Sequence, residues 1–360
     1  MSAEETAGVP GLYLRPLRID PAACSAPDAL PLAGGVLGFR ACEVIRRNAG
    51  RITRTIEPVA DLAARQGPNA EIWLNRLAAP RAPFADVAMD RPQVMGVINV
   101  TPDSFSDGGD RFDVAAAVAD GLAMSEAGAA FLDVGGESTR PGAEPVPLEE
   151  ELRRVLPVVR GLVGQGAAVS IDSRHARVMA EALEAGARLV NDVTALTGDP
   201  DSLPLVAEAG VPVILMHMQG EPRTMQAAPR YDDAALDVFD ALTARVEACE
   251  AAGIPRERIM LDPGIGFGKT LDHNLQLLEQ LALFHGAGCP LLLGVSRKSF
   301  IGRLSGNPPP KARMPGSLAA ALAGVERGVQ VLRVHDVAET LQALEVWRAI
   351  AGAEPEPAAP

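Results

Sequence analysis

Residues 94–109 read VMGVINVTPDSFSDGG, a short apolar run that passes into a polar, glycine-rich segment. The β-branched residues of 94–98 are typical of a strand that is buried on both faces. Turn-forming residues over 101–104 and 107–109 end that strand. In α/β proteins, reactive groups commonly lie on loops that follow buried strands in this way. One such turn would be ordinary, but the pattern recurs down the chain, each time with a different polar tip.

The recurrence of this pattern predicts the fold. Eight apolar runs fit it, over residues 94–98, 130–134, 168–171, 188–190, 212–216, 258–261, 290–295 and 330–334. Segments rich in Ala and Leu separate them and have a helical pattern, for example over 114–127, 149–163, 176–185, 231–252, 274–284 and 316–328. Strands that alternate with helices predict a parallel sheet, and eight of them predict an α/β fold of the TIM-type (β/α)8 barrel class. A doubly wound open sheet is the alternative.

The barrel is expected over residues 91–350, with an additional N-terminal region over 1–90 and a disordered tail over 351–360. In the N-terminal region we expect a strand at 11–19, a strand or a strand and helix at 34–47, and a helix within 56–79. No chemical motif occurs there, so we interpret it as a structural appendage or subunit contact that the chemistry does not require. Trp73 is expected to be a packing residue.

Composition limits the possible partners. The chain has 360 residues, 48% of them hydrophobic, and a formal net charge of −13. This charge argues against nucleic acid as a main partner and gives no reason to expect an anionic membrane surface. No apolar run approaches the ~18 residues of a membrane span. The four cysteines form no zinc or redox motif, and a reduced, cytoplasmic compartment is the simplest interpretation.

Polar residues follow all eight predicted strands. They are Asn99, the segment 135–140 (GGESTR), Asp172, Asn191 with Asp192, His217, Asp262, the segment 296–298 (SRK), and Arg333 with His335 and Asp336. In a (β/α)8 barrel these strand ends share one rim, where active sites lie. Buried carboxylates and amides are costly unless they are partnered. The pattern therefore indicates a site for a polar heterocycle, although structural hydrogen bonding inside the barrel is the alternative for any single residue.

Two groups of tips suggest different ligands. Asp172, Asn191 and Asp262 have the acceptors and donors to bind the edge of an amino-pyrimidine-like ring. The cationic tips suit a pyrophosphate, because phosphate sites often follow strands seven and eight of such barrels. These cationic residues are Arg140, Arg297, Lys298, Arg333 and His335.

Familiar catalytic motifs are absent from the sequence. Residues 264–270 read GIGFGKT, but Pro263 and Lys269 occupy positions where a P-loop or a dinucleotide fingerprint requires glycine. We interpret this stretch as a loop whose backbone approaches the ligand, with Lys269 near the pocket. His217 is given no catalytic role. Because no protein nucleophile is evident, substitution between two bound substrates is favoured over covalent catalysis.

Eight segments closely resemble the dihydropteroate synthase family of bacterial folate biosynthesis. They are VMGVINVTPDSFSDGG, FLDVGGESTRPGA, VSIDSRH, VNDV, LMHMQGEPRTMQ, LDPGIGFGK, GVSRKSFIG and RVHDV, in the family's order over about 93–345. Residues 1–90 lie outside the family's bacterial pattern. Ser173 and Arg174 stand where many members have Thr-Lys, a change that should not alter the chemistry.

The resemblance implies a transferase that condenses 6-hydroxymethyl-7,8-dihydropterin pyrophosphate with 4-aminobenzoate, giving 7,8-dihydropteroate and pyrophosphate by an SN1-like substitution. It implies pterin contacts from Asp172, Asn191, Asp262 and Lys298. It implies pyrophosphate contacts from Asn99, Thr139, Arg140, Arg333 and His335. It implies 4-aminobenzoate contacts from Pro102, Phe105, Arg140, Phe267 and Ser299. The catalytic residues would be Asp172, Lys298, Arg333 and His335.

The resemblance also implies a cofactor and an assembly. Asn99 would help to hold Mg²⁺, and the protein would be a homodimer that uses its late helices as the contact. The loops 102–109 and 139–143 would fold over the site and shape a pocket that sulfonamides would enter.

Two alternatives remain open. A methyltetrahydrofolate methyltransferase would share the ring contacts, but it has no need of the cationic grip formed by Lys298, Arg333 and His335. A non-catalytic pterin-binding paralogue would be expected to lose Asn99, the loops or that grip.

Overall fold

The computed structural model describes most of the chain, namely residues 11–100, 113–138, 143–221 and 223–352. Eight strands form its centre: β6 (Gln93–Asn99), β7 (Phe131–Gly135), β8 (Val169–Asp172), β9 (Leu189–Asp192), β10 (Val213–Met216), β11 (Ile259–Asp262), β12 (Leu292–Leu293) and β13 (Val331–Val334). They pair in parallel in the order β11-β10-β9-β8-β7-β6-β13-β12. A parallel bridge between Leu261 and Leu291 joins the two ends of the sheet. The predicted (β/α)8 barrel is therefore confirmed.

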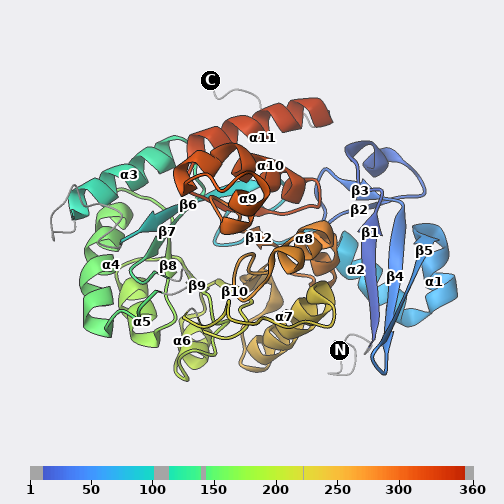
Figure 1. The fold of residues 1–360 in the computed structure, drawn as a ribbon, viewed down its shortest axis with the longest axis horizontal. Helices are drawn as coiled ribbons and strands as arrows, with labels where there is room; N and C mark the ends of the chain where they lie inside the picture. Colours follow the sequence, from blue (N-terminus) through green and yellow to red (C-terminus); the bar gives the residue numbers. More distant parts are fainter. Residues whose placement is uncertain (1–10, 101–112, 139–142, 222, 353–360) are drawn as a thin grey trace.

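Helices surround the strands in Figure 1. They are α3 (Val114–Glu126), α4 (Leu148–Val163), α5 (Ala176–Glu184), α6 (Ser202–Ala209), α7 (Ala234–Ala251), α8 (Leu271–Glu279), α9 (Ser299–Leu304), α10 (Met314–Val325) and α11 (Val337–Ala351). The helix expected over 274–284 is wrong at its end, because α8 stops at Glu279 and the 3-10 helix η4 (Leu281–Ala287) follows. Every residue of η4 is buried, so the amphipathic pattern of a surface helix does not apply there.

Apolar side chains close the floor of the barrel. Met95, Phe131, Leu189, Ile214, Met260, Leu292 and Val331 come from the amino-terminal parts of seven strands and form one buried cluster. Phe84 and Met89, from the segment before β6, join this cluster. The polar tips lie at the opposite, carboxyl ends of the strands, so this mouth is the end available to a substrate.

The N-terminal region contains a three-stranded antiparallel sheet in the order β1-β4-β5, made of β1 (Leu12–Leu17), β4 (Ala41–Asn48) and β5 (Arg51–Pro58). A short pair, β2 (Leu30–Pro31) and β3 (Gly38–Phe39), and two helices, α1 (Val59–Gln66) and α2 (Pro68–Ala78), complete it. The strand expected at 11–19 is present, and 34–47 forms strands without a helix.

The helix expected within 56–79 is partly wrong. Ala49 and Gly50 both have positive φ and form the two-residue turn that pairs β4 with β5, which places Ile56 in a strand with 64% of its surface exposed. Gly67, with φ of +76°, then divides the helical segment into α1 and α2.

Aromatic packing attaches this region to the barrel. Trp73 of α2 stacks on Phe239 of α7 with ring centroids 5.2 Å apart, and Tyr13 meets both rings edge-on. A Cβ on Gly286 would lie 1.9 Å from the Trp73 ring, so only glycine allows this close approach. Trp73 is 5% exposed, which confirms the expected packing role. No helix within the described residues is long and apolar enough to span a membrane.

Candidate active site

One arginine joins several of the predicted residues at the barrel mouth. Arg333 donates from Nε to Asp133 Oδ2 at 2.6 Å and from Nη2 to Asp172 Oδ2 at 2.7 Å. Asn191 donates from Nδ2 to the same Oδ2 of Asp133 at 2.9 Å. Asp172 and Arg333 retain 12% and 22% side-chain exposure, so they face the mouth, whereas the Asp133 side chain is fully buried. The site therefore has two carboxylates around a single guanidinium.

Asp133 is the residue that reading the strand tips missed. It lies inside β7, two residues before the strand ends, and its signal in the sequence is a carboxylate within the otherwise apolar run FLDVG. Its hydrogen bonds align the Arg333 and Asn191 side chains with each other. We infer that Asp133 fixes how Asn191, of the ring-binding residues, lies relative to Arg333, of the cationic residues.

Burial controls the charges in this network. Burial raises the pKa of Asp172, and the Asp133 carboxylate adds to the effect, while the Arg333 guanidinium opposes it. Burial lowers the pKa of Arg333, but Asp133 and Asp172 more than reverse the shift, so the guanidinium stays charged. A cation bound next to Asp172 would favour the ionised form of this carboxyl, whose pKa burial raises.

Asp262 and Lys298 form a second group on the same rim. Asp262 Oδ1 accepts a hydrogen bond from the Gly264 amide at 2.7 Å. Lys298 Nζ donates to the carbonyl oxygen of Ile265 and lies 4.6 Å above the centre of the Phe267 ring. Burial lowers the pKa of Lys298 to about 8, although the Asp262 carboxylate opposes the shift. A part of the Lys298 side chains is therefore deprotonated at pH values just above neutral.

The glycine-rich loop 264–270 packs against the segment that follows β10. Gly264 has a φ of +68°, and a Cβ there would lie 1.9 Å from the His217 carbonyl oxygen. Lys269 is 2% exposed, and its Nζ contacts His217 Nδ1 at 3.0 Å and the Phe267 carbonyl oxygen at 2.9 Å. Burial and the nearby Lys269 lower the pKa of His217 to about 3, which keeps its ring neutral. Lys269, expected near the pocket, therefore fixes the loop from inside.

The tips of β12 and β13 are tied together. Arg297 donates from both Nε and Nη2 to the Asp336 carboxylate, the Nε bond being 3.0 Å long. His335 Nδ1 lies 3.0 Å from Ser296 Oγ. Arg297, which the sequence placed among the rim cations, is thus bound to Asp336 and connects the two loops. Ser299 begins α9 directly after Lys298.

Asn99 ends β6, half-buried, in register with Gly135 of β7. A Cβ on Gly135 would lie 3.3 Å from Asp172 Oδ2, so this glycine makes room for that carboxylate. The remaining expected site residues lie outside the described part of the chain: Pro102, Phe105, Thr139 and Arg140. The same holds for most of the two expected covering loops, 102–109 and 139–143.

A cleft of about 710 Å³ opens beside the network. Its walls include Glu137, Arg174, Thr194, Met216 and Arg245, and Glu137 accepts two hydrogen bonds from Arg174, at 2.8 and 3.0 Å. Glu137 and His217, from two of the predicted polar tips, line this cleft, whereas none of the described residues expected to contact the substrates does. Its wall segments nevertheless continue directly from β8, β9 and β10, so the cleft adjoins the mouth, and its volume is typical of small-molecule sites.

A closed (β/α)8 barrel with polar side chains on this rim has the architecture of a barrel enzyme. The family described as pterin binding enzyme matches residues 95–335. Dihydropteroate synthase of Escherichia coli (strain K12) is 48% identical over 267 residues, which cover 74% of this chain and 94% of the relative. That of Haemophilus influenzae is 47% identical over 73% of this chain and 95% of its own length.

Solved structures of similar proteins support the same family. Dihydropteroate synthase of Xanthomonas albilineans with 4-aminobenzoic acid is 50% identical, with a TM-score of 0.71, over 77% of this chain and 99% of that one. The same enzyme with 7,8-dihydropteroate gives 48% identity and a TM-score of 0.68. The chain belongs to the dihydropteroate synthase family. These relatives are covered almost from end to end, whereas about a quarter of this chain has no match in them.

Proposed function

We propose that the protein is a dihydropteroate synthase, which joins 6-hydroxymethyl-7,8-dihydropterin pyrophosphate to 4-aminobenzoate and releases pyrophosphate. The observation that carries this proposal is the Arg333 fork to Asp133 and Asp172, beside Asn191, at the mouth of a barrel of this family. Structures of the Xanthomonas albilineans relative with 4-aminobenzoic acid and with 7,8-dihydropteroate support the substrate and product classes.

The pterin ring would bind at Asp172, Asn191, Asp262 and Lys298. A carboxylate matches the paired donors of a ring N–H and an exocyclic amine, while an amide or ammonium can donate to ring acceptors. Asp262 is already held by the Gly264 amide and Asn191 by Asp133, so both side chains are preorganised. Binding then requires little reorganisation of the site.

The reaction would separate charge between two ends of the site. Loss of pyrophosphate leaves positive charge on the pterin methylene, which the Asp172 carboxylate can stabilise. Arg333 and His335 would hold the departing pyrophosphate, and Arg333 already donates a hydrogen bond to Asp172. This division of charge favours an SN1-like path in which the carbon–oxygen bond breaks before the amine attacks.

The chemistry of the rim is compatible with Mg²⁺. No cluster of three or more His, Cys, Asp or Glu ligands occurs within the described residues. Mg²⁺ commonly keeps several waters and binds through one or two protein oxygens plus substrate phosphates. The Asn99 side chain, half-buried at the end of β6, offers one such oxygen. When bound, the ion would neutralise charge on the pyrophosphate.

4-Aminobenzoate would bind beside Lys298. Ser299, the first residue of α9, would meet its carboxylate, and Phe267 would contact its ring. Pro102, Phe105, Thr139 and Arg140 are proposed to complete the substrate contacts around this pocket. The catalytic barrel would span 91–350, with 1–90 as an accessory region and 351–360, of which 353–360 lie outside the described residues, as a tail. We place the protein in the cytoplasm.

Pterin affinity should fall as the pH rises through about 8, because the Lys298 ammonium present below its pKa is lost above it. Calorimetry with the free pterin across about pH 7 to 9 measures this. Lys298→Arg, whose guanidinium does not titrate there, should bind without the decline. Because burial raises the pKa of the Asp172 carboxyl into the same range, the comparison with Lys298→Arg decides. Identical pH profiles for the two proteins would contradict the assignment of Lys298.

A homodimer is expected, with a contact on the late helices. Large apolar side chains are exposed on α8, α9 and α11, with exposed fractions of 38% for Leu275, 58% for Leu304, 55% for Val346 and 82% for Ile350. Light scattering at micromolar concentration should give twice the mass of the chain. A monomer mass would refute the prediction, and Ile350→Glu should shift a dimer towards monomer.

The function is tested by incubating the purified protein with both substrates and Mg²⁺. 7,8-Dihydropteroate and pyrophosphate should form in equal amounts, and omitting either substrate should abolish the pteroate product. Binding of the pterin without turnover would favour the non-catalytic alternative. Pyrophosphate release without pteroate would indicate hydrolysis and would contradict the proposed transfer.

A further inference from the structure

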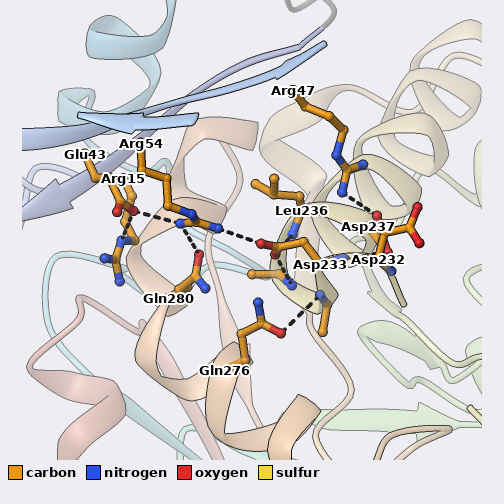
Figure 2. A network of polar contacts seen from close by, with 12 residues as sticks. Arg15, Glu43, Arg47, Arg54, Asp232, Asp233, Leu236, Asp237, Gln276 and Gln280 are labelled. Atoms are coloured by element: carbon orange, nitrogen blue, oxygen red, sulfur yellow. Dashed lines mark hydrogen bonds and ion pairs between the residues drawn. The ribbon is translucent and has the colours of Figure 1, made fainter. Parts of the chain in front are cut away.

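The N-terminal region meets the barrel through arginines that face acidic and amide groups on α7 and α8 (Figure 2). Arg54, on the outer strand β5, donates from Nη2 to Asp233 Oδ2 at 2.6 Å and from Nη1 to Gln280 Oε1 at 3.2 Å. The same Nη1 donates to Glu43 Oε2 at 2.9 Å, which anchors the guanidinium to its own sheet. One side chain of this region thus joins the start of α7 to the end of α8.

Asp233 is the residue that caps the amino terminus of α7. Its Oδ1 accepts hydrogen bonds from the amides of Ala235 and Leu236, each 3.2 Å long, and its side chain is 8% exposed. A carboxylate as buried as this needs cationic or hydrogen-bonding partners. Arg54 supplies the cation, so it helps to determine where α7 begins.

The beginnings of both helices contact the glycine-rich loop of the site. Tyr231, two residues before Asp233, donates from its hydroxyl to the Gly268 carbonyl oxygen at 2.8 Å. In the first turn of α8, Asn274 Oδ1 accepts from the Gly266 amide at 2.6 Å. The Ala234 amide of α7 donates to Gln276 Oε1 of α8 at 3.2 Å. The loop 264–270 is therefore held by the starts of two helices that also hold each other.

We propose that Arg54 is a positioning residue for the 4-aminobenzoate side of the site. By joining α7 to α8 from outside the barrel, it keeps the loop 264–270 in place and holds the Phe267 ring beneath Lys298. The substrate named here rests on the proposed function, whereas the coupling of Arg54 to the loop does not. Arg54 lies outside residues 95–335, which the family matches, so the coupling is an addition made by the N-terminal region.

Hydrogen exchange tests the coupling without reference to activity. Arg54→Gln should raise amide exchange over 264–270 about fivefold, the effect of losing one partly buried ion pair, and leave β7 on the far side of the barrel unchanged. The KM for 4-aminobenzoate should rise by a similar factor with kcat nearly constant. Arg54→Lys should restore part of both, since one ammonium nitrogen cannot reach all the acceptors that the two guanidinium nitrogens reach.

Arg46→Gln is the matched control. Arg46 donates to Gln66 within the N-terminal region, so its loss should change neither the loop exchange nor the KM. If Arg54→Gln does not fold stably, Gln280→Leu removes only the contact to the end of α8, and the same two measurements apply. Faster exchange of the loop in a protein without synthase activity would support the coupling and overturn the proposed function. Unchanged loop exchange in a folded variant, or a rise spread evenly over the barrel strands, would overturn the coupling.

Discussion

Asp172→Asn should lower kcat by about 100-fold or more while weakening pterin binding far less. The substitution keeps the size of the side chain and removes its negative charge. In the ground state, an amide oxygen can still accept a hydrogen bond from the ring. In the transition state, the positive methylene loses the carboxylate that faces it. Asp133 cannot replace that carboxylate, because its side chain is fully buried behind Arg333.

Steady-state kinetics and calorimetry with the free pterin separate the two effects. Asp262→Asn is the comparison, since that carboxylate is proposed to bind the ring and not to meet the methylene charge. We expect Asp262→Asn to weaken pterin binding more than it lowers kcat. A near-normal kcat in Asp172→Asn would show that this carboxylate has no part in the chemical step.

Arg333→Ala should raise the KM for the pterin pyrophosphate and lower kcat, because its proposed partner is charged in both the ground and the transition state. Binding of a free pterin without pyrophosphate should weaken less. Arg333→Lys, which keeps a positive charge but cannot fork to two carboxylates, should recover only part of the activity. Complete loss of free-pterin binding in a folded Arg333→Ala protein would contradict the assignment of Arg333 to the pyrophosphate.

The same substitution should also reduce stability. It leaves Asp133 and Asp172 without their shared guanidinium, and removing one partner of a buried ion pair costs about 3–5 kcal/mol of unfolding free energy. Without Arg333 the folded-state pKa of Asp172, which burial already raises, rises further above its unfolded value. The folded variant then binds more protons than the unfolded chain, so its deficit should shrink as the pH falls. Denaturant unfolding of both proteins at several pH values measures this.

Much of the barrel follows from local sequence. Each strand is an apolar run with a polar tip, and the closed parallel topology brings those tips to one rim, as Asp172, Asn191 and Arg333 show. Asp133 was missed because only the polar residues that follow each strand were considered, and Asp133 lies within its strand. Arg297 was expected among the rim cations, but its pairing with Asp336, 39 residues away, could not be predicted because only the fold brings the two together.

The N-terminal region could not be placed from sequence. Trp73, Arg54 and Arg47 look like ordinary surface or core residues until their partners on α7 are known, and those partners are separated from them by more than 160 positions. The turn at Ala49 and Gly50 is a local feature, yet the helical pattern beginning at Ile56 obscured the strand β5. Contacts between distant segments therefore determine the part of the molecule that the family does not share.

The carbon–oxygen bond of the pterin methylene should break before the amine of 4-aminobenzoate attacks. Deuterium at the methylene tests this most directly, since a carbon that becomes planar and cationic reacts more slowly when deuterated. We predict a normal isotope effect on the chemical step, clearly above unity, in single-turnover reactions with both substrates and Mg²⁺. A value at or below unity would indicate attack in concert with departure, and would contradict the division of charge between Asp172 and the pyrophosphate grip.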